Sequence, residues 1–249
     1  MEATAWQMAV LAFCSMLIGF SKTGVPTAGI FVAAILAGVF PARESVGLLL
    51  PILIIGDIFA IVYYRKAVVW KYILILLPWV FVGLLAGFGV LWRISNASLS
   101  VLIGAIVLVL IALFLFQERI ERRFRFESAK SKTVRAVLGF LAGFTTMVGN
   151  AAGSIMSIYL LSHGIKKKEF MGTNAYYFFI VNVVKVPFLV YLGLINASSA
   201  ALNLWMIPAV AAGAWFGFTV LPKIPQKLFQ AIVLACAAAG GVYLIWNGV

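Results

Sequence analysis

The chain has 249 residues, of which 64% are hydrophobic and 10% are charged. A water-soluble domain of this length needs far more polar surface to cover its core, so the composition excludes one. The formal net charge of +12 does not indicate a nucleic-acid partner, because the basic residues lie in short loops between apolar segments. We therefore expect the lipid bilayer to be the solvent of this protein.

Ten apolar segments follow one another along the chain, and the longer ones approach or exceed the ~20 residues that a spanning helix needs. The first, second, sixth and seventh are shorter and are broken by Gly, Pro or Asn. The segments cover residues 5–20, 24–40, 45–64, 72–92, 98–116, 134–148, 151–163, 170–192, 198–220 and 227–246. The pattern predicts an all-α polytopic membrane protein with about eight full transmembrane helices plus short or broken helical hairpins. A β-barrel would instead show alternating segments of about ten residues.

The first two segments are joined by residues 19–26, GFSKTGVP. A break of this kind exposes backbone N–H groups and aims a helix N-terminus inward, which suits an anion. Ser21, Lys22, Thr23 and Gly24 are therefore candidate binding residues, and Lys22 would add a full positive charge. The alternative is a tight turn at the membrane surface, with Lys22 extended to water. Residues 1–4 carry no basic group, so the first segment is expected to be a retained helix and not a cleaved signal peptide.

Asp57 lies in the middle of the third segment. A carboxyl group inside a helical bundle can take up and release a proton, so Asp57 is a candidate proton carrier. The alternative is a structural acid that is hydrogen-bonded or paired with a lysine.

Residues 117–133 form a basic linker that divides the chain into a first membrane repeat, 1–116, and a second, 134–249. We interpret this linker as a solvated cytoplasmic connector that sets the topology, although binding of anionic lipid or of a partner is an alternative.

The sixth and seventh segments meet at residues 143–150, GFTTMVGN, in the position that corresponds to the first break. Thr145, Thr146, Gly149 and Asn150 are candidate binding residues for the same reason as those of the first break. This second motif carries no lysine, so the predicted site is charge-asymmetric.

The eighth segment carries a polar face, because Asn174, Phe178, Asn182 and Lys185 recur at helical spacing. A lysine among Val residues is expensive in hydrocarbon and should face the bundle interior or a wet cavity. We therefore add Asn174, Asn182 and Lys185 to the candidate substrate-binding residues. The alternative is that Lys185 lies near enough to the outer surface to reach water.

The two halves of the chain match in order. The matching residues are Gly19 with Gly143 and Gly29 with Gly153 at an offset of 124, Gly47 with Gly172 and Asp57 with Asn182 at 125, and Pro78, Gly83 and Gly87 with Pro208, Gly213 and Gly217 at 130. Each half holds five segments, and an odd number makes the second copy enter the membrane from the opposite side. The sequence thus predicts two inverted five-segment repeats, as found in many secondary transporters.

The loop charges predict the orientation. With the basic linker in the cytoplasm, the loops on that side hold most of the Lys and Arg residues, whereas the opposite loops hold only Arg43 and Arg93. We therefore expect a multi-pass protein of the bacterial inner membrane with both termini periplasmic. The sequence leaves a homo-oligomer open.

No nucleophile–base arrangement, phosphate-binding loop or dinucleotide fingerprint occurs, and Cys14 and Cys236 stand alone without metal-ligand spacing. We expect no enzymatic activity, no cofactor and no metal. Active transport would then draw on an ion gradient or on a partner ATPase.

Three blocks of the sequence resemble the TauE/SafE family of sulfite and organosulfonate exporters. The blocks are residues 19–26, residues 47–51 with Gly56-Asp57 and residues 63–65, and residues 172–187 with Asn174, Asn182 and Lys185. The resemblance implies export of a small sulfur-containing anion such as sulfite, sulfoacetate or a related organosulfonate, coupled to the proton gradient. The alternative function is a permease for another solute, either a cation or a neutral metabolite.

Overall fold

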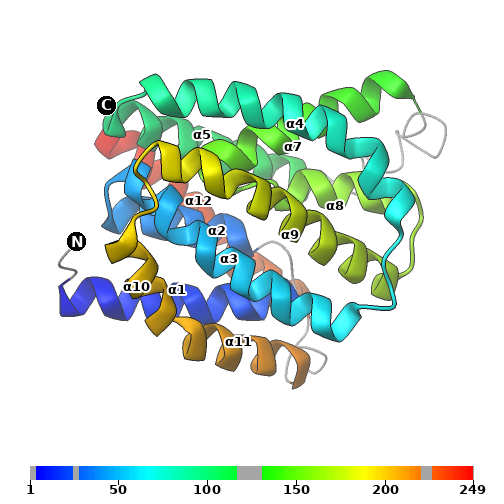
Figure 1. Cartoon of the computed structure of the whole chain (residues 1–249), viewed down its shortest axis with the longest axis horizontal. Helices are drawn as coiled ribbons and strands as arrows, with labels where there is room; N and C mark the ends of the chain where they lie inside the picture. Colours follow the sequence, from blue (N-terminus) through cyan, green and yellow to red (C-terminus); the bar gives the residue numbers. More distant parts are fainter. Residues whose placement is uncertain (1–3, 25–27, 117–130, 220–225, 249) are drawn as a thin grey trace.

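The computed structural model describes residues 4–24, 28–116, 131–219 and 226–248, and all regular secondary structure within them is helical (Figure 1). The helices are α1 (Ala5–Thr23), α2 (Ala28–Val39), α3 (Ala42–Tyr64), α4 (Trp70–Arg93), α5 (Asn96–Leu115), α7 (Lys132–Gly149), α8 (Gly153–Leu161), α9 (Lys167–Tyr191), α10 (Ala197–Trp205), α11 (Ile207–Thr219) and α12 (Gln226–Gly248). The all-helical class predicted from the sequence is confirmed.

Each predicted apolar segment coincides with a helix, except that the ninth, 198–220, contains two. These are α10 and α11, whose axes differ by 44° at Met206. Pro208 favours an interruption here, because proline has no N–H group to donate to the helical ladder. The prediction of one continuous segment here was wrong.

Five helices of the described residues are long and apolar enough to cross a membrane, or six if α10 and α11 count as one bent span. Two helices next to the predicted breaks are shorter than a span, since α2 has 12 residues and α8 has 9. About eight full spans therefore stays a prediction.

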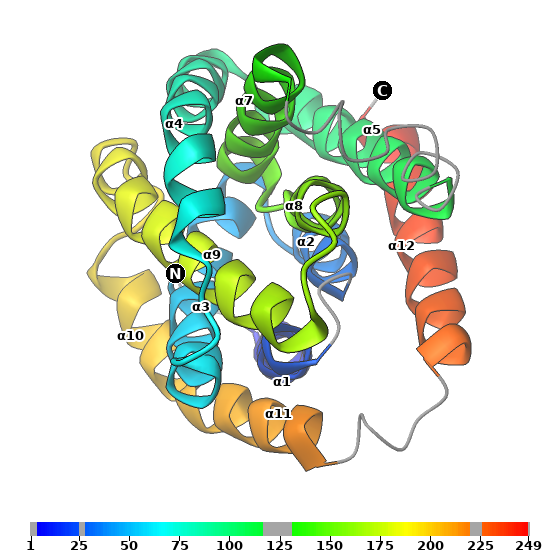
Figure 2. The ribbon, with the colours of Figure 1, turned by 90° about the vertical axis from the view of Figure 1, so that its right-hand side faces the viewer.

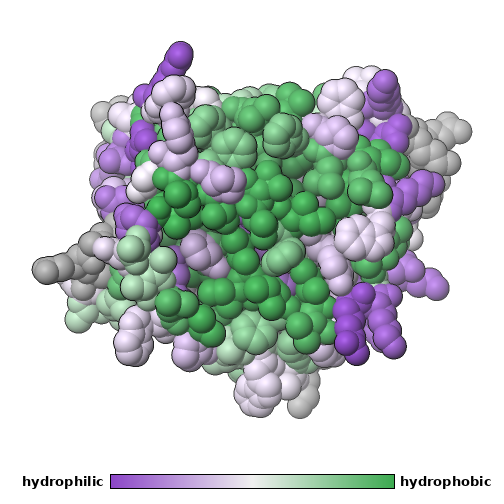
Figure 3. All heavy atoms as spheres, viewed as in Figure 1, coloured by the Kyte–Doolittle hydropathy of each residue, from purple (hydrophilic) through white to green (hydrophobic). Residues whose placement is uncertain are grey.

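The surface has the layout expected of a protein in a bilayer. In the view of Figure 3, hydrophobic residues gather over the middle of the molecule and hydrophilic residues lie toward its two ends. Large apolar side chains of α4, including Leu74, Phe81 and Val82, are about half exposed or more. Lipid accounts for such exposure in a molecule whose helices are long and apolar enough to cross a membrane.

The first and the last helix of the chain share one end of the molecule. α1 begins and α12 ends at the same end of the molecule, whereas α4, α7 and α9 begin at the opposite end (Figure 1). The basic residues at the starts of these three helices, among them Lys71, Lys132 and Lys168, therefore share one end of the bundle.

Seen along the long axis, α1, α2, α3, α8 and α9 lie toward the middle, and α4, α5, α7, α10, α11 and α12 lie around them (Figure 2). α3 packs against α9 near the centre. The polar residues of α3 and α9 are thereby shielded from lipid.

Two helix pairs cross with their backbones in contact, and both crossings depend on glycine. A Cβ atom at Gly19 of α1 would overlap the carbonyl oxygen of Val210 on α11. In the same way, a Cβ atom at Gly143 of α7 would overlap the carbonyl oxygen of Val80 on α4. Glycine and other small residues are common where helices pack closely in membranes, because they allow the two backbones to approach each other.

Candidate functional site

A cavity of about 30 Å³ lies among the central helices. This is room for about two water-sized groups. Its walls come from α1, α2, α3, α9 and the break between α7 and α8, and are made by Ile18, Ser21, Lys22, Gly29, Ile30, Leu53, Thr146, Asn150, Ala151, Gly153, Asn174, Phe178 and Asn182. Both predicted broken motifs and the polar face of the eighth segment therefore meet at one place.

Lys22 of α1 lies inside the molecule and does not extend to its surface. Its Nζ atom is 2.7 Å from Oδ1 of Asp57 on α3, and its side chain is only 10% exposed. The same Nζ atom lies 4.3 Å from the centre of the Phe178 ring on α9. An ammonium between a carboxylate and an aromatic face is stabilised from both sides.

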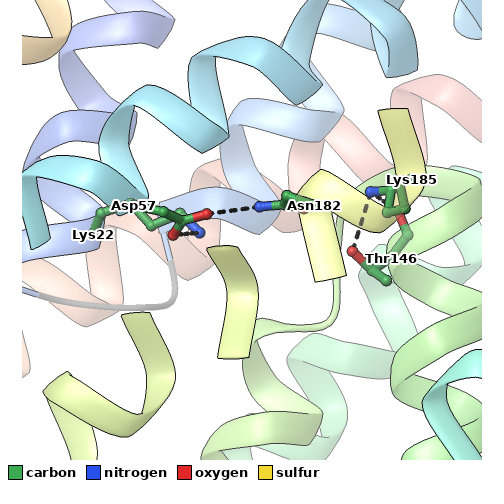
Figure 4. Close-up of polar contacts among 5 residues, drawn as sticks. All are labelled: Lys22, Asp57, Thr146, Asn182 and Lys185. Atoms are coloured by element: carbon green, nitrogen blue, oxygen red, sulfur yellow. Dashed lines mark hydrogen bonds and ion pairs between the residues drawn. The ribbon is translucent and has the colours of Figure 1, made fainter. Parts of the chain in front are cut away.

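Asp57 is fully buried and bridges the two halves of the chain. While Oδ1 pairs with Lys22, Oδ2 accepts a hydrogen bond of 2.8 Å from Nδ2 of Asn182 on α9 (Figure 4). The two residues that the sequence repeat aligns, Asp57 and Asn182, thus contact each other directly.

Lys185 is also fully buried, and it is held by the end of α7. Its Nζ atom donates to the carbonyl oxygen of Thr146 at 2.6 Å and lies 3.3 Å from the hydroxyl of the same residue (Figure 4). A third hydrogen bond joins Nζ to Oδ1 of Asn150. An ammonium at the C-terminal end of a helix satisfies free carbonyl groups and opposes the negative end of the helix dipole.

Asn150 ends α7 and creates the second break. It adopts a left-handed conformation with φ of 54°, which asparagine tolerates better than most residues. Its Nδ2 atom donates to the carbonyl oxygen of Val46 on α3 at 3.1 Å, while its Oδ1 atom accepts from Lys185. The side chain is therefore fixed at both ends.

Two helices begin at the cavity. Gly29 is the second residue of α2, and Gly153 is the first residue of α8; both line the cavity. The first N–H groups of a helix have no partner within that helix, and the helix dipole is positive there. The first predicted break also includes residues 25–27, which lie outside the described residues.

Six of the predicted binding residues line this cavity: Ser21, Lys22, Thr146, Asn150, Asn174 and Asn182. Lys185 and Asp57 lie behind its wall, each bonded to a lining residue. The others, Thr23, Gly24, Thr145 and Gly149, are not part of the lining.

Two of these four residues bond to nearby backbone. The Thr23 hydroxyl is 3.3 Å from the carbonyl oxygen of Ala214, and the Thr145 hydroxyl donates to the carbonyl oxygen of Leu141 at 2.7 Å. Both hydroxyls are engaged in helix contacts away from the cavity.

Several lining residues were not predicted. Ile18, Ile30, Leu53 and Ala151 are apolar residues among many others in the sequence, and no pattern distinguishes them. Gly29 and Gly153 did carry a signal, since the repeat aligns them, and Phe178 lies on the polar face of the eighth segment.

Two oxygen atoms of the lining residues lack a hydrogen-bond partner within the described part of the chain. They are Oδ1 of Asn174 and Oδ1 of Asn182. Buried acceptors of this kind are rare in folded proteins, so each is a candidate contact for a ligand.

Comparison with known proteins gives one significant match. Residues 10–244 match the family model described as "Sulfite exporter TauE/SafE". No significant match was found among curated proteins or among solved structures.

Proposed function

The chain belongs to the TauE/SafE sulfite exporter family, and on this basis we propose that it is a secondary transporter that exports small sulfur-containing anions. The proposed substrates are sulfite, sulfoacetate or a related organosulfonate. The observation that carries the proposal is a cavity among the central helices that is lined by Lys22 and by residues at the starts of two helices, α2 and α8. Because the family is one of transporters, we propose no enzymatic activity.

The cavity has the chemistry of an anion site. Lys22 provides a full positive charge. The positive dipole ends of α2 and α8 lie at the lining residues Gly29 and Gly153, and the first N–H groups of a helix have no partner within that helix. In an interior of low dielectric these contributions act more strongly than they would in water.

We further propose that the two halves are inverted repeats related by a two-fold axis that passes near Asp57 and Asn182. In support, equivalent residues make equivalent contacts: Gly19 packs on Val210 as Gly143 packs on Val80. Gly83 likewise packs on the Phe140 backbone as Gly213 packs on the Met16 backbone. In repeats of this kind, movement of one unit against the other exposes a central site to each side in turn.

Asp57 is the proposed proton-coupling residue. Its carboxylate is the counter-ion of Lys22 in the structure, at 2.7 Å. A proton on Asp57 would cancel this counter-charge and so change the net charge beside the cavity. The state of Asp57 would thereby change the affinity of the cavity for its substrate.

We place the protein in the bacterial inner membrane, with both termini in the periplasm. The starts of α4, α7 and α9 carry basic residues and lie at the end of the bundle away from both termini. By the positive-inside tendency that basic end faces the cytoplasm.

The test is sulfite flux from loaded proteoliposomes. Lys22→Gln alone would leave the buried Asp57 carboxylate uncompensated, which threatens folding. The double variant Lys22→Gln/Asp57→Asn removes the ion pair without leaving a charge, and we expect it to lower sulfite flux about tenfold or more, because a charged contact is lost. Lys66→Gln, at an exposed position, is the matched control and should keep the flux.

The same system tests the coupling. Asp57→Asn should weaken the response of sulfite flux to an imposed pH gradient relative to wild type, and a pH dye in the lumen shows in which direction protons move relative to the anion. Full sulfite flux in the double variant would refute the proposed site. Flux of cations or neutral metabolites, with none of sulfite, would refute the anion assignment.

A further inference from the structure

The amide group of Asn182 has a fixed orientation. Its Nδ2 atom donates to Oδ2 of Asp57 at 2.8 Å. While Asp57 is ionised, as in its ion pair with Lys22, its carboxylate can only accept, so the amide of Asn182 cannot be turned over. The remaining atom, Oδ1, is therefore an acceptor. Asn182 is fully buried and lines the cavity, and this Oδ1 has no partner among the described residues.

A hydrogen-bond acceptor in the wall of an anion site distinguishes anions that carry a hydroxyl hydrogen from anions that do not. The oxygens of a fully deprotonated oxyanion carry no hydrogen and would be repelled by Oδ1 of Asn182. An oxyanion that keeps one hydroxyl group can instead donate this hydrogen to Oδ1 and direct its charged oxygens to Lys22 and the helix N-termini. Asn174 does not require a hydroxyl hydrogen on the anion. No hydrogen bond to another described residue fixes its amide, so the amide can turn either its oxygen or its N–H groups to the ligand.

The charges around the cavity agree with one negative charge on the ligand. Three acceptors surround Nζ of Lys185, which matches the three donors of an ammonium group. With Lys22 and Lys185 positive and Asp57 negative, these three side chains carry one net positive charge. A monoanion neutralises this charge, whereas a dianion would leave an uncompensated negative charge in an apolar interior.

We propose that the cavity is selective for a singly charged oxyanion that retains one hydroxyl hydrogen, with Asn182 as the specificity-determining residue. This inference rests on the proposed function and narrows its substrate class. Hydrogensulfite has the required form, whereas an organosulfonate head group has no hydroxyl hydrogen and sulfite itself is a dianion.

A pair of matched probes tests the selectivity. Methylphosphonate with one proton and methanesulfonate have the same shape and charge, and differ in one hydroxyl hydrogen. In proteoliposomes that transport sulfite, methylphosphonate should inhibit at a concentration about tenfold or more below that of methanesulfonate. Equal inhibition by the two, or stronger inhibition by methanesulfonate, overturns the proposal while sulfite flux persists. Absence of sulfite flux would instead be a failure of the proposed function.

The charge requirement is tested by raising the pH until methylphosphonate loses its second proton. Methanesulfonate does not titrate and reports any effect of pH on the protein itself. The potency of methylphosphonate relative to methanesulfonate should fall through this transition. A constant or rising ratio overturns the requirement for a monoanion.

Two variants identify the residue responsible. Asp57→Asn frees the Asn182 amide to turn its N–H groups to the cavity and adds one positive charge, so the preference for methylphosphonate should shrink toward equality. Asn174→Ala removes an amide of the same cavity that is not oriented, and should keep the preference. Retained preference in Asp57→Asn, or its loss in Asn174→Ala, would assign selectivity to a group other than Asn182. Inhibitor binding to detergent-solubilised protein, measured by thermal shift, gives the same comparison for variants with low flux.

Discussion

Gly29 is the residue at which the cavity can be narrowed with least disturbance of the fold. It lines the cavity, and an added Cβ atom there would meet no atom of the described residues within 4 Å. We expect Gly29→Ala to keep the thermal midpoint of wild type, since alanine also favours the helix, but to lower sulfite flux several-fold by filling space that the anion needs. Flux and thermal midpoint are measured on the same preparation.

The matched control for this change is Gly89→Ala. Gly89 lies in α4, outside the cavity lining, and an added Cβ atom there is equally unobstructed. Wild-type flux in both variants would mean that the anion does not occupy the space beside Gly29.

At the scale of single residues, the sequence identified the polar positions but not their partners. Lys22, Asn182 and Lys185 were recognisable because polar groups in apolar segments are costly and are kept for a purpose. The pairing of Lys22 with Asp57 follows from how α1 packs on α3, and that packing is not encoded in local periodicity. Thr23 and Thr145 could not be separated from Ser21 and Thr146, since only the rotation of each helix decides which side chain lines the cavity.

At the scale of helices, the crossings of α1 with α11 and of α4 with α7 should tolerate no side chain at their glycines. We expect Gly143→Ala and Gly19→Ala each to destabilise the protein by about 1–3 kcal/mol, because the added methyl would overlap backbone and force the helices apart. A lower midpoint of thermal unfolding in detergent would show this effect.

Gly149→Ala, on the same helix as Gly143, is the control for this prediction. Its added Cβ atom would make an ordinary contact of 3.4 Å with Ile103. Midpoints that are equal for Gly143→Ala and Gly149→Ala would argue against the close crossing.

The helices themselves were largely predictable, because bilayer thickness and the cost of unpaired backbone groups restrict an apolar segment to a helix of known length. The boundaries of α3 and α4 accordingly lie within three residues of the predicted ones. The bend at Met206 was not predicted. Pro208 signalled an interruption, but the matching Pro78 lies inside the continuous helix α4, so the outcome depends on packing and not on proline alone.

At the scale of the whole molecule, inverted repeats require equivalent loops to face opposite sides of the membrane. We expect Lys66→Cys and Lys132→Cys to react with an impermeant maleimide only after spheroplasts are permeabilised, whereas Ala197→Cys reacts in intact spheroplasts. All three positions are exposed in the structure. Cys14 and Cys236 are first replaced by Ser, and this background without new cysteines is the blank. Labelling of Lys66→Cys and Ala197→Cys from the same side would refute the inverted arrangement.

The predicted repeat rests on glycines and on the Asp57–Asn182 pair, which keep their order along both halves. The sequence could not say which equivalent residues would meet. The hydrogen bond between Asp57 and Asn182 follows only from α3 and α9 crossing at the centre of the molecule.

The buried charges also bear on how the chain is made. A lysine such as Lys185 makes it costly for its helix to enter lipid without a partner. Its partners Thr146 and Asn150, however, lie at the end of α7, which is synthesised earlier. Asp57 similarly follows Lys22. Lys185 and Asp57 thus reach the membrane when their partners are already there, so the order of synthesis lowers the cost of inserting these two fully buried side chains into lipid.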